Sequence, residues 1–144
     1  MTPVWEHRVA YHEVDGQKIV FNSHYFEWID AAAYGFFRLG GWTVADLERL
    51  GLDFVVSRAD LRFESPIRLD ETVGVDTEVL RVGRSSFAMC FRIRVNSRQC
   101  AWAEITYVNA GTEGPKAIPD PIRAHMHHGT GCESEPRGGK PDHA

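Results

Sequence analysis

The chain of 144 residues carries 20 acidic and 16 basic side chains, and 43% of its residues are hydrophobic. This length suits one domain with a sizeable core, and the acidic balance argues against a nucleic-acid-binding protein. No apolar stretch approaches the length of a membrane span, and no signal-peptide pattern opens the chain. We therefore expect a cytoplasmic protein with no nucleic-acid or membrane partner.

The first predicted elements are a strand over residues 4–11 and a long helix over residues 23–39. The strand alternates weakly, whereas apolar residues in the helix recur three or four positions apart and fill most other positions too. Asn22 or Ser23 is expected to cap the helix, and Gly40 with its neighbouring glycine to end it. A helix that is apolar on nearly every side must be covered on most of them.

A second, short helix is predicted between Thr43 as its cap and Gly51 as its terminator. The chain then becomes strands with alternating apolar residues, three of them joined by short turns. The four predicted strands are centred on residues 58–64, 73–79, 87–95 and 101–107. One last turn or short helix is expected within residues 116–126.

Composition divides the chain into a folded domain over residues 1–128 and a tail over residues 129–144, which is rich in Gly, Pro and charge and is expected to be disordered. Cys90 and Cys100 lie in strand-like segments and are expected to be small core residues, because the cysteine spacing supports neither a zinc knuckle nor a disulfide framework. The histidine-rich segment 125–128 is flanked by glycine, and we predict no metal site there or elsewhere.

Two acids, Glu13 and Asp15, lie in a loop-like segment just before the long helix. Asp15 precedes Asn22 by seven positions, which is too early to cap the helix. On local chemistry alone, Asp15 is a solvated turn residue beside Gly16. Glu13 is expected in a salt bridge or at the surface.

The stretch "YHEVDGQKIVFNSHYFEWIDAA" resembles the signature of hot-dog-fold acyl-CoA thioesterases of the 4-hydroxybenzoyl-CoA thioesterase type. That signature has an aromatic residue, two acids two positions apart, a Gly-containing loop, apolar residues and a Tyr that opens the central helix. The matching residues here are Tyr11, Glu13, Asp15, Ile19, Val20, Phe21, Tyr25 and Trp28. The resemblance covers about residues 4–124. The sequence departs from the usual residues at Glu13, Lys18, Asn22 and His24.

The resemblance implies an α+β hot-dog fold, in which a curved antiparallel sheet of about five strands wraps around one long central helix. Such a sheet cannot enclose the helix, and the last strands would leave an unpaired sheet edge. We therefore expect a two-fold homodimer. The resemblance implies the same dimer, often doubled into a homotetramer, with the acyl pocket between two chains.

Thioester hydrolysis needs a nucleophile or base, and donors for the developing oxyanion. The resemblance implies that Asp15 supplies the first, as general base or as nucleophile, and that backbone amides around Asn22 and Ser23 supply the second. His24 and Tyr25 complete the candidate substrate-binding set, although Asn22 can equally be an N-cap and a helix-surface histidine is the plainer interpretation of His24. No cofactor is implied, because coenzyme A is part of the acyl-CoA substrate.

Two other functions stay open. A hot-dog hydratase or dehydratase generally pairs a His with an Asp, for which His24 and Asp15 are the candidates, and a non-catalytic acyl-binding subunit would share the fold. Glu27 and Asp30 lie on the helix where another hot-dog branch carries its carboxylate, but an ordinary charged seam with Arg38 is the expectation. The acyl group is open as well, because the aromatic residues of the helix are as well explained by the core as by a pocket.

Overall fold

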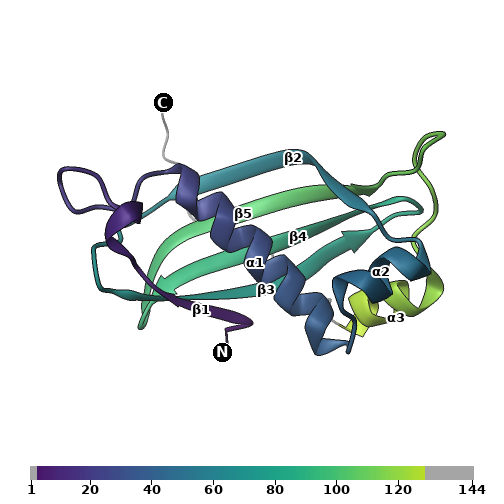
Figure 1. The fold of residues 1–144 in the computed structure, drawn as a ribbon, viewed down its shortest axis with the longest axis horizontal. Helices are drawn as coiled ribbons and strands as arrows, with labels where there is room; N and C mark the ends of the chain where they lie inside the picture. Colours follow the sequence, from purple (N-terminus) through teal and green to yellow (C-terminus); the bar gives the residue numbers. More distant parts are fainter. Residues whose placement is uncertain (1–2, 129–144) are drawn as a thin grey trace.

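The computed structural model describes residues 3–128, which form a five-stranded antiparallel sheet curved around one long helix, α1 (Figure 1). The predicted tail, residues 129–144, lies outside the described residues. The elements are β1 (Trp5–Arg8), a 3-10 turn η1 (Tyr11–Glu13), α1 (Ser23–Leu39), α2 (Val44–Leu50), β2 (Phe54–Phe63), β3 (Thr72–Val82), β4 (Ser86–Val95), β5 (Arg98–Asn109) and α3 (Asp120–His128). Among them, no helix combines the length and apolarity that a membrane crossing requires.

Helix α1 has the bounds that its sequence pattern predicts. It ends at Gly40, and Gly41 follows with a positive φ of 90°, a conformation that glycine adopts without strain. Gly35 lets β1 approach closely, since a Cβ there would lie 2.8 Å from the Val4 carbonyl oxygen. The buried face of α1 packs on the sheet, while Phe26 on the other side keeps 42% of its surface exposed. One chain therefore covers the helix on one side only.

The sheet has the strand order β1-β3-β4-β5-β2. All four strands predicted after α2 are confirmed, and each is longer than its alternating run indicated. β2 begins at Phe54 and contains an irregularity between Val56 and Arg58. The expectation that the last strands form a free edge is wrong, because β5 lies between β4 and β2. The connection through α1 and α2 carries β2 to the far side of β5, so β1 and β2 are the edges.

A compact aromatic cluster fills the space between α1 and the sheet near the carboxyl end of the helix. Phe54 packs edge-on against Tyr107 with ring centroids 5.2 Å apart, and Phe87 stacks on Tyr107 at 5.0 Å. Cys90 and Cys100 are buried, as predicted for small core residues. The core thus lies on the concave side of the sheet, and the edge strand β2 lies at the margin of this core.

Helices α2 and α3 close the carboxyl end of α1 (Figure 1). Thr43 caps α2 as predicted: its side chain accepts a hydrogen bond from the Asp46 amide, and the Asp46 carboxylate accepts one from the Thr43 amide. Gly51 ends α2 with a φ of 91°. α3 confirms the expected last helix, and the ring of its His125 lies with Nε2 2.8 Å from the Phe36 carbonyl oxygen.

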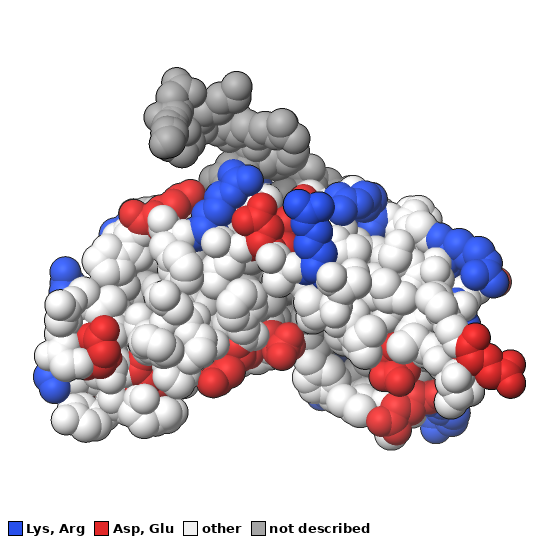
Figure 2. All heavy atoms as spheres, turned by 90° about the horizontal axis from the view of Figure 1, so that it is seen from above, with Lys and Arg blue, Asp and Glu red and all other residues white. Residues whose placement is uncertain are grey.

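The surface along β2 differs from the rest of the molecule. Figure 2, which views the molecule from the β2 side of Figure 1, shows a broad area without charged side chains, with acidic and basic residues gathered toward its margins. Large apolar side chains are exposed on β2 itself, Val55 at 49%, Val56 at 51% and Phe63 at 50%. The same strand also carries Arg58, Asp60 and Arg62, so the edge combines apolar and charged side chains. An unpaired strand edge with exposed apolar side chains is a typical docking surface for another chain.

Candidate active site

The segment that leads into α1 is a tight hairpin over residues 13–21. The Asp15 amide donates to the Ile19 carbonyl at 3.0 Å, and the Phe21 amide donates to the Glu13 carbonyl at 2.9 Å. The second arm of the hairpin runs directly into the first turn of α1. Glu13 is thereby paired with Phe21, the residue before Asn22, while Asp15 lies two residues farther along the arm, paired with Ile19 near the tip. The expected approach of the Asp15 carboxylate to the helix start stays a prediction.

Asp15 occupies the first position of the turn at the tip of this hairpin. Its carbonyl accepts from the Lys18 amide at 2.9 Å, and its Oδ1 accepts from the Gln17 amide at 2.8 Å. Lys18 completes the turn with a φ of 62°. Both interpretations of Asp15 are therefore compatible with this geometry, because the side chain orders the turn through Oδ1 while Oδ2 has no hydrogen-bond partner among the described residues.

The start of α1 leaves two backbone donors open. Asn22 stands at the N-cap position but makes no capping hydrogen bond with its side chain. The first turn closes through the His24 amide on Phe21 and the Tyr25 amide on Asn22. The amides of Asn22 and Ser23 donate to no described residue, and both residues are exposed. Two free N–H groups at a helix start are the arrangement that receives an anion or an oxyanion.

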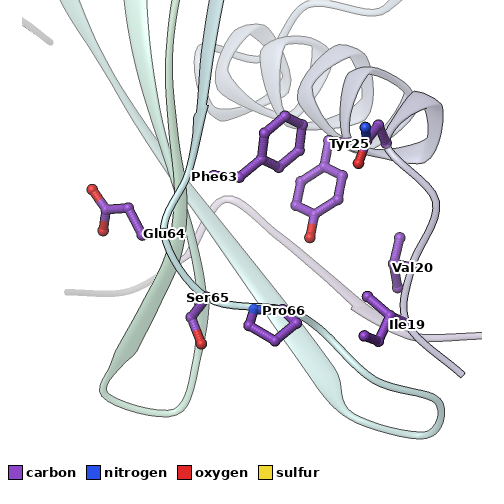
Figure 3. A pocket seen from close by; sticks show the side chains of 8 residues that line it. Ile19, Val20, Tyr25, Phe63, Glu64, Ser65 and Pro66 are labelled. Atoms are coloured by element: carbon purple, nitrogen blue, oxygen red, sulfur yellow. The ribbon is translucent and has the colours of Figure 1, made fainter. Parts of the chain in front are cut away.

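A cavity of about 320 Å³ opens beside this helix start (Figure 3). Its lining comes from the hairpin, the first turn of α1 and the end of β2, and consists of Ile19, Val20, Asn22, Tyr25, Phe63, Glu64, Ser65 and Pro66. In Figure 3 the Tyr25 side chain extends from α1 with its hydroxyl directed toward the space between Ile19 and Pro66, whereas Glu64 points away. The cavity brings together two of the predicted site residues, Asn22 and Tyr25.

Tyr25 is suited to donate a hydrogen bond within this cavity. Its ring is buried and meets Phe63 edge-on at 5.0 Å. Burial, helped by nearby Cys100 and opposed by Arg98, raises the pKa of Tyr25 to about 12. The hydroxyl is therefore neutral near pH 7, and no described residue hydrogen-bonds it.

His24 does not line the cavity, and neither do Asp15 and Ser23. The His24 ring lies with Nδ1 3.3 Å from the Glu27 carboxylate and meets the His12 ring edge-on at 6.1 Å. Its side chain is 18% exposed, so it is half-buried rather than the plain surface histidine that the sequence favoured. The contacts of His24 connect it to Glu27 and not to Asp15.

The expected charged seam on α1 is not found among the described residues. Glu27 contacts His24, and neither Glu27 nor Asp30 forms an ion pair with Arg38. Asp30 instead lines a second cavity, of about 390 Å³, farther along α1, where Tyr34, Phe54, Val56 and six other residues complete the wall. Burial raises the pKa of the Asp30 carboxyl group.

Glu13 is the residue whose surroundings the sequence analysis predicted least accurately. It is 3% exposed rather than at the surface. One carboxylate oxygen contacts His7 Nε2 at 2.6 Å and accepts from the Ala10 amide at 2.8 Å, while the other accepts from the Trp28 indole N–H at 2.9 Å. Burial by itself would raise the pKa of Glu13, but the three hydrogen bonds together hold it below the ordinary value. The expected surface position is therefore wrong, and the expected salt bridge corresponds to the contact with His7, which is an ion pair when that ring is protonated.

Ligand atoms of Glu13, His24 and Glu27 lie within 4.8 Å of one another, a spacing that a cation could bridge. The Glu13 oxygens already take part in three hydrogen bonds, which explains their position without a metal. The absence of a metal and of a cofactor stays a prediction from the sequence.

The residues that sequence reasoning missed lie at the end of β2, where Phe63, Glu64, Ser65 and Pro66 form one wall of the cavity. The one sequence feature that marked this region was Pro66, which indicates where the alternating run of β2 ends. Nothing local in the sequence indicates that this strand end lies beside the start of α1.

The sequence model of the thioesterase superfamily matches residues 17–101, more than half of the chain. The chain belongs to the thioesterase superfamily. The match confirms that the protein is an enzyme of thioester hydrolysis and, with the sheet and helix described above, confirms the α+β hot-dog fold. The matched segment begins two residues after Asp15, so the role of this residue does not follow from the match.

One similar protein and two solved structures show how far the likeness in sequence and fold extends. The acyl-CoA thioesterase YbgC of Haemophilus influenzae is 27% identical over 124 residues, which span 84% of this chain and 91% of that protein. A thioesterase from Thermus thermophilus, crystallised with coenzyme A and Zn, superposes with a TM-score of 0.74 at 23% identity, covering 88% of this chain and 93% of that one. A gentisyl-coenzyme A thioesterase superposes with a TM-score of 0.77 at 22% identity, covering 85% and 98%.

Proposed function

We propose that this thioesterase hydrolyses acyl-CoA esters to a free acid and coenzyme A, with Asp15 as the base or nucleophile and the amides of Asn22 and Ser23 as the oxyanion site. The observation that carries the proposal is the helix start: two exposed amides without a partner among the described residues follow the hairpin that carries Asp15, and Asn22, which bears one of them, lines the cavity. The H. influenzae relative, named an acyl-CoA thioesterase, supports the choice of coenzyme A as the thiol.

In the proposed hydrolysis each group has a separate role. The amides of Asn22 and Ser23 would stabilise the negative charge that grows on the thioester oxygen in the transition state. The carboxylate of Asp15 would take a proton from the attacking water, or attack the carbonyl itself to give an anhydride that water then opens. On the base route the proton taken from water would pass to the sulfur of coenzyme A as it leaves; on the anhydride route the sulfur would leave as thiolate and take its proton from water. The neutral Tyr25 hydroxyl can orient the acyl group inside the cavity. Because coenzyme A is the leaving group, the reaction needs no further cofactor, and a cytoplasmic location suits such a substrate.

The same proposal includes a homodimer through the β2 edge. A two-fold axis would pair β2 antiparallel with the partner's β2, bury the exposed valines of this strand and add hydrogen bonds to its free edge. Antiparallel pairing sets the Phe63 end of one strand beside the Phe54 end of the other. The cavity at the helix start would then face the partner's second cavity, which Phe54 lines, so that two chains complete each site.

The test is release of free thiol from a panel of CoA esters with aromatic, medium-chain and short acyl groups. The wild type should turn over at least one of them, and Asp15→Asn, which keeps the shape of the side chain, should lose about 10²–10⁴-fold in kcat. Asp70→Asn is the matched control, because Asp70 is also an exposed turn residue and its φ of 68° suits Asn.

Turnover of Asp15→Asn within a few-fold of the wild type on the best ester would refute the catalytic assignment. Hydration of crotonyl-CoA without thiol release would favour a hydratase, and binding of CoA esters without any turnover would favour an acyl-binding subunit. The hydratase alternative gains no support from the contacts of His24, since this ring lies against Glu27 and not against Asp15.

A further inference from the structure

The carboxylate of Glu13 joins three separate elements at the base of the Asp15 hairpin. It receives the Ala10 amide from the start of η1, contacts the His7 ring from β1 and receives the Trp28 indole from α1. The His7 ring in turn stacks on Trp5 at 5.2 Å and lies 5.8 Å from Trp28. A single buried side chain therefore ties the hairpin to the strand before it and to the helix after it.

The hairpin has few other attachments to α1. The Glu13 carbonyl accepts from the Phe21 amide, and the next pair of the ladder joins Asp15 to Ile19. Asp15 is thus two residues beyond the Glu13 anchor and one ladder step from it. The second arm of the hairpin is held separately, by the Val20 amide on the Ile67 carbonyl at 2.8 Å and the Leu69 amide on the Lys18 carbonyl at 3.2 Å. The Glu13 anchor therefore acts on the first arm, the one that carries Asp15.

Stability alone is a poor explanation for a carboxylate at this position. Taking an ionised acid out of water costs free energy, and replacing such a group with an apolar residue of similar volume is often neutral or stabilising. What three directed hydrogen bonds provide, and apolar packing does not, is a fixed orientation.

We infer that Glu13, with His7 and Trp28, is a positioning residue that holds Asp15 in register with the open amides at the start of α1. This inference rests on the proposed function and extends it. Glu13 itself would touch neither substrate nor the reacting atoms, since it is buried beneath the hairpin and does not line the cavity. A misplacement of the reacting groups by about 1 Å can cost on the order of 100-fold in rate.

The experiment is a double-mutant cycle between Glu13→Gln and Asp15→Asn, measured as thiol release from the best CoA ester. Gln keeps the size of the side chain but offers one acceptor oxygen and adds a donor, so the three donors around it cannot all be satisfied. Glu13→Gln alone should lower kcat by about 10- to 100-fold with KM changed less than about 3-fold. In the Asp15→Asn background the same change should cost less than about 3-fold, because no carboxylate is left to misplace.

A second pair of variants tests the anchor at His7, whose side chain is 30% exposed. His7→Ala removes the contact to Glu13, whereas His7→Gln places an amide N–H near the position of Nε2 and should restore most of kcat. Asn109→Ala is the control for lost stability without lost positioning, because the buried Asn109 side chain joins the end of β5 to the segments that follow α2 and precede α3. It should lower the melting temperature and leave kcat below that temperature unchanged.

Equal losses from Glu13→Gln in both backgrounds, or equal activities of His7→Ala and His7→Gln, would overturn the inference and assign Glu13 to the fold alone. Those outcomes are distinct from failure of the proposed function, which would show as an active Asp15→Asn single variant.

Discussion

The two ends of α1 differ in how their backbone hydrogen-bonding groups are satisfied. At the carboxyl end every feature closes the helix: the Gly40 and Gly41 amides bond back to Phe37 and Arg38, and His125 lies against the Phe36 carbonyl. At the amino end Asn22 occupies the cap position without capping, and two amides stay open. One helix thus has an end whose backbone groups are bonded and an end at which two amides have no partner among the described residues. Departures from good local structure of this kind are expected at functional sites.

The largest loss of stability should come from replacing Asn109, which lies near the closed carboxyl end of α1. Its side chain accepts from the Asp53 amide and donates to the Gly51 and Ala117 carbonyls. Asn109→Ala leaves three backbone groups without that partner, so the free energy of unfolding should fall by at least about 3 kcal/mol. Urea unfolding measures it. A loss below about 1 kcal/mol would mean that the closed end is not the stable one.

The exposed β2 edge, which ends beside the cavity at the amino end of α1, should be the surface that meets a second chain. Val56→Lys places a charge on the exposed β2 edge and should weaken dimerisation by at least about tenfold, which is about 1.4 kcal/mol. Light scattering over a dilution series measures the shift toward the 16.3-kDa chain. Leu39→Lys, an exposed position at the closed end of α1, is the control and should leave the assembly unchanged. A wild type that is monomeric and active at micromolar concentration would refute the shared site.

Two cap residues give a matched comparison of smaller size. Thr43 caps α2 through its side chain, so Thr43→Ala should cost about 1 kcal/mol of unfolding free energy. Asn22 makes no such bond, and Asn22→Ala should cost less than about 0.5 kcal/mol. Thermal unfolding of the two variants under the same conditions measures the two losses of stability. Equal losses would show that Asn22 does cap α1, and the open-end interpretation would be wrong.

The smallest effect concerns Asp30, midway along α1. Burial raises the pKa of its carboxyl group in the folded protein, so the ionised form is destabilising there. The destabilisation is complete above the folded-state pKa and disappears as the pH falls below the unfolded-state value, about 3.8. Asp30→Asn should therefore raise the melting temperature slightly at about pH 7 and not at about pH 3. A rise of the same size at both values would assign the gain to something other than charge.

Local patterns in the sequence predicted what local chemistry determines. The bounds of α1, the Thr43 cap and the Gly51 terminator follow from residues within one or two turns of each other, and all were confirmed. The place of β2 at the sheet edge was missed, because strand order depends on where a crossover lands and not on the strand's own residues.

The candidate site shows the same division. The hairpin and the helix start are neighbours in sequence, and the family signature located them. The burial of Glu13 depends on partners six and fifteen positions away, and the cavity wall depends on Phe63, almost forty residues from Tyr25. No pattern of spacing in one sequence encodes such pairings, because they are set by how the packed elements meet.

The hairpin between Glu13 and Phe21 also constrains how this protein can diverge. Its arms have side chains that alternate between two faces, so a one-residue insertion or deletion within an arm would turn the side chains of that arm, Asp15 on one or the buried Val20 on the other, toward the opposite side. Substitutions at the tip, such as Gln17 or the exposed Gly16, leave the alternation unchanged. In descendants of this chain the composition of that turn can drift, whereas its length is inherited as a unit with the carboxylate that it carries.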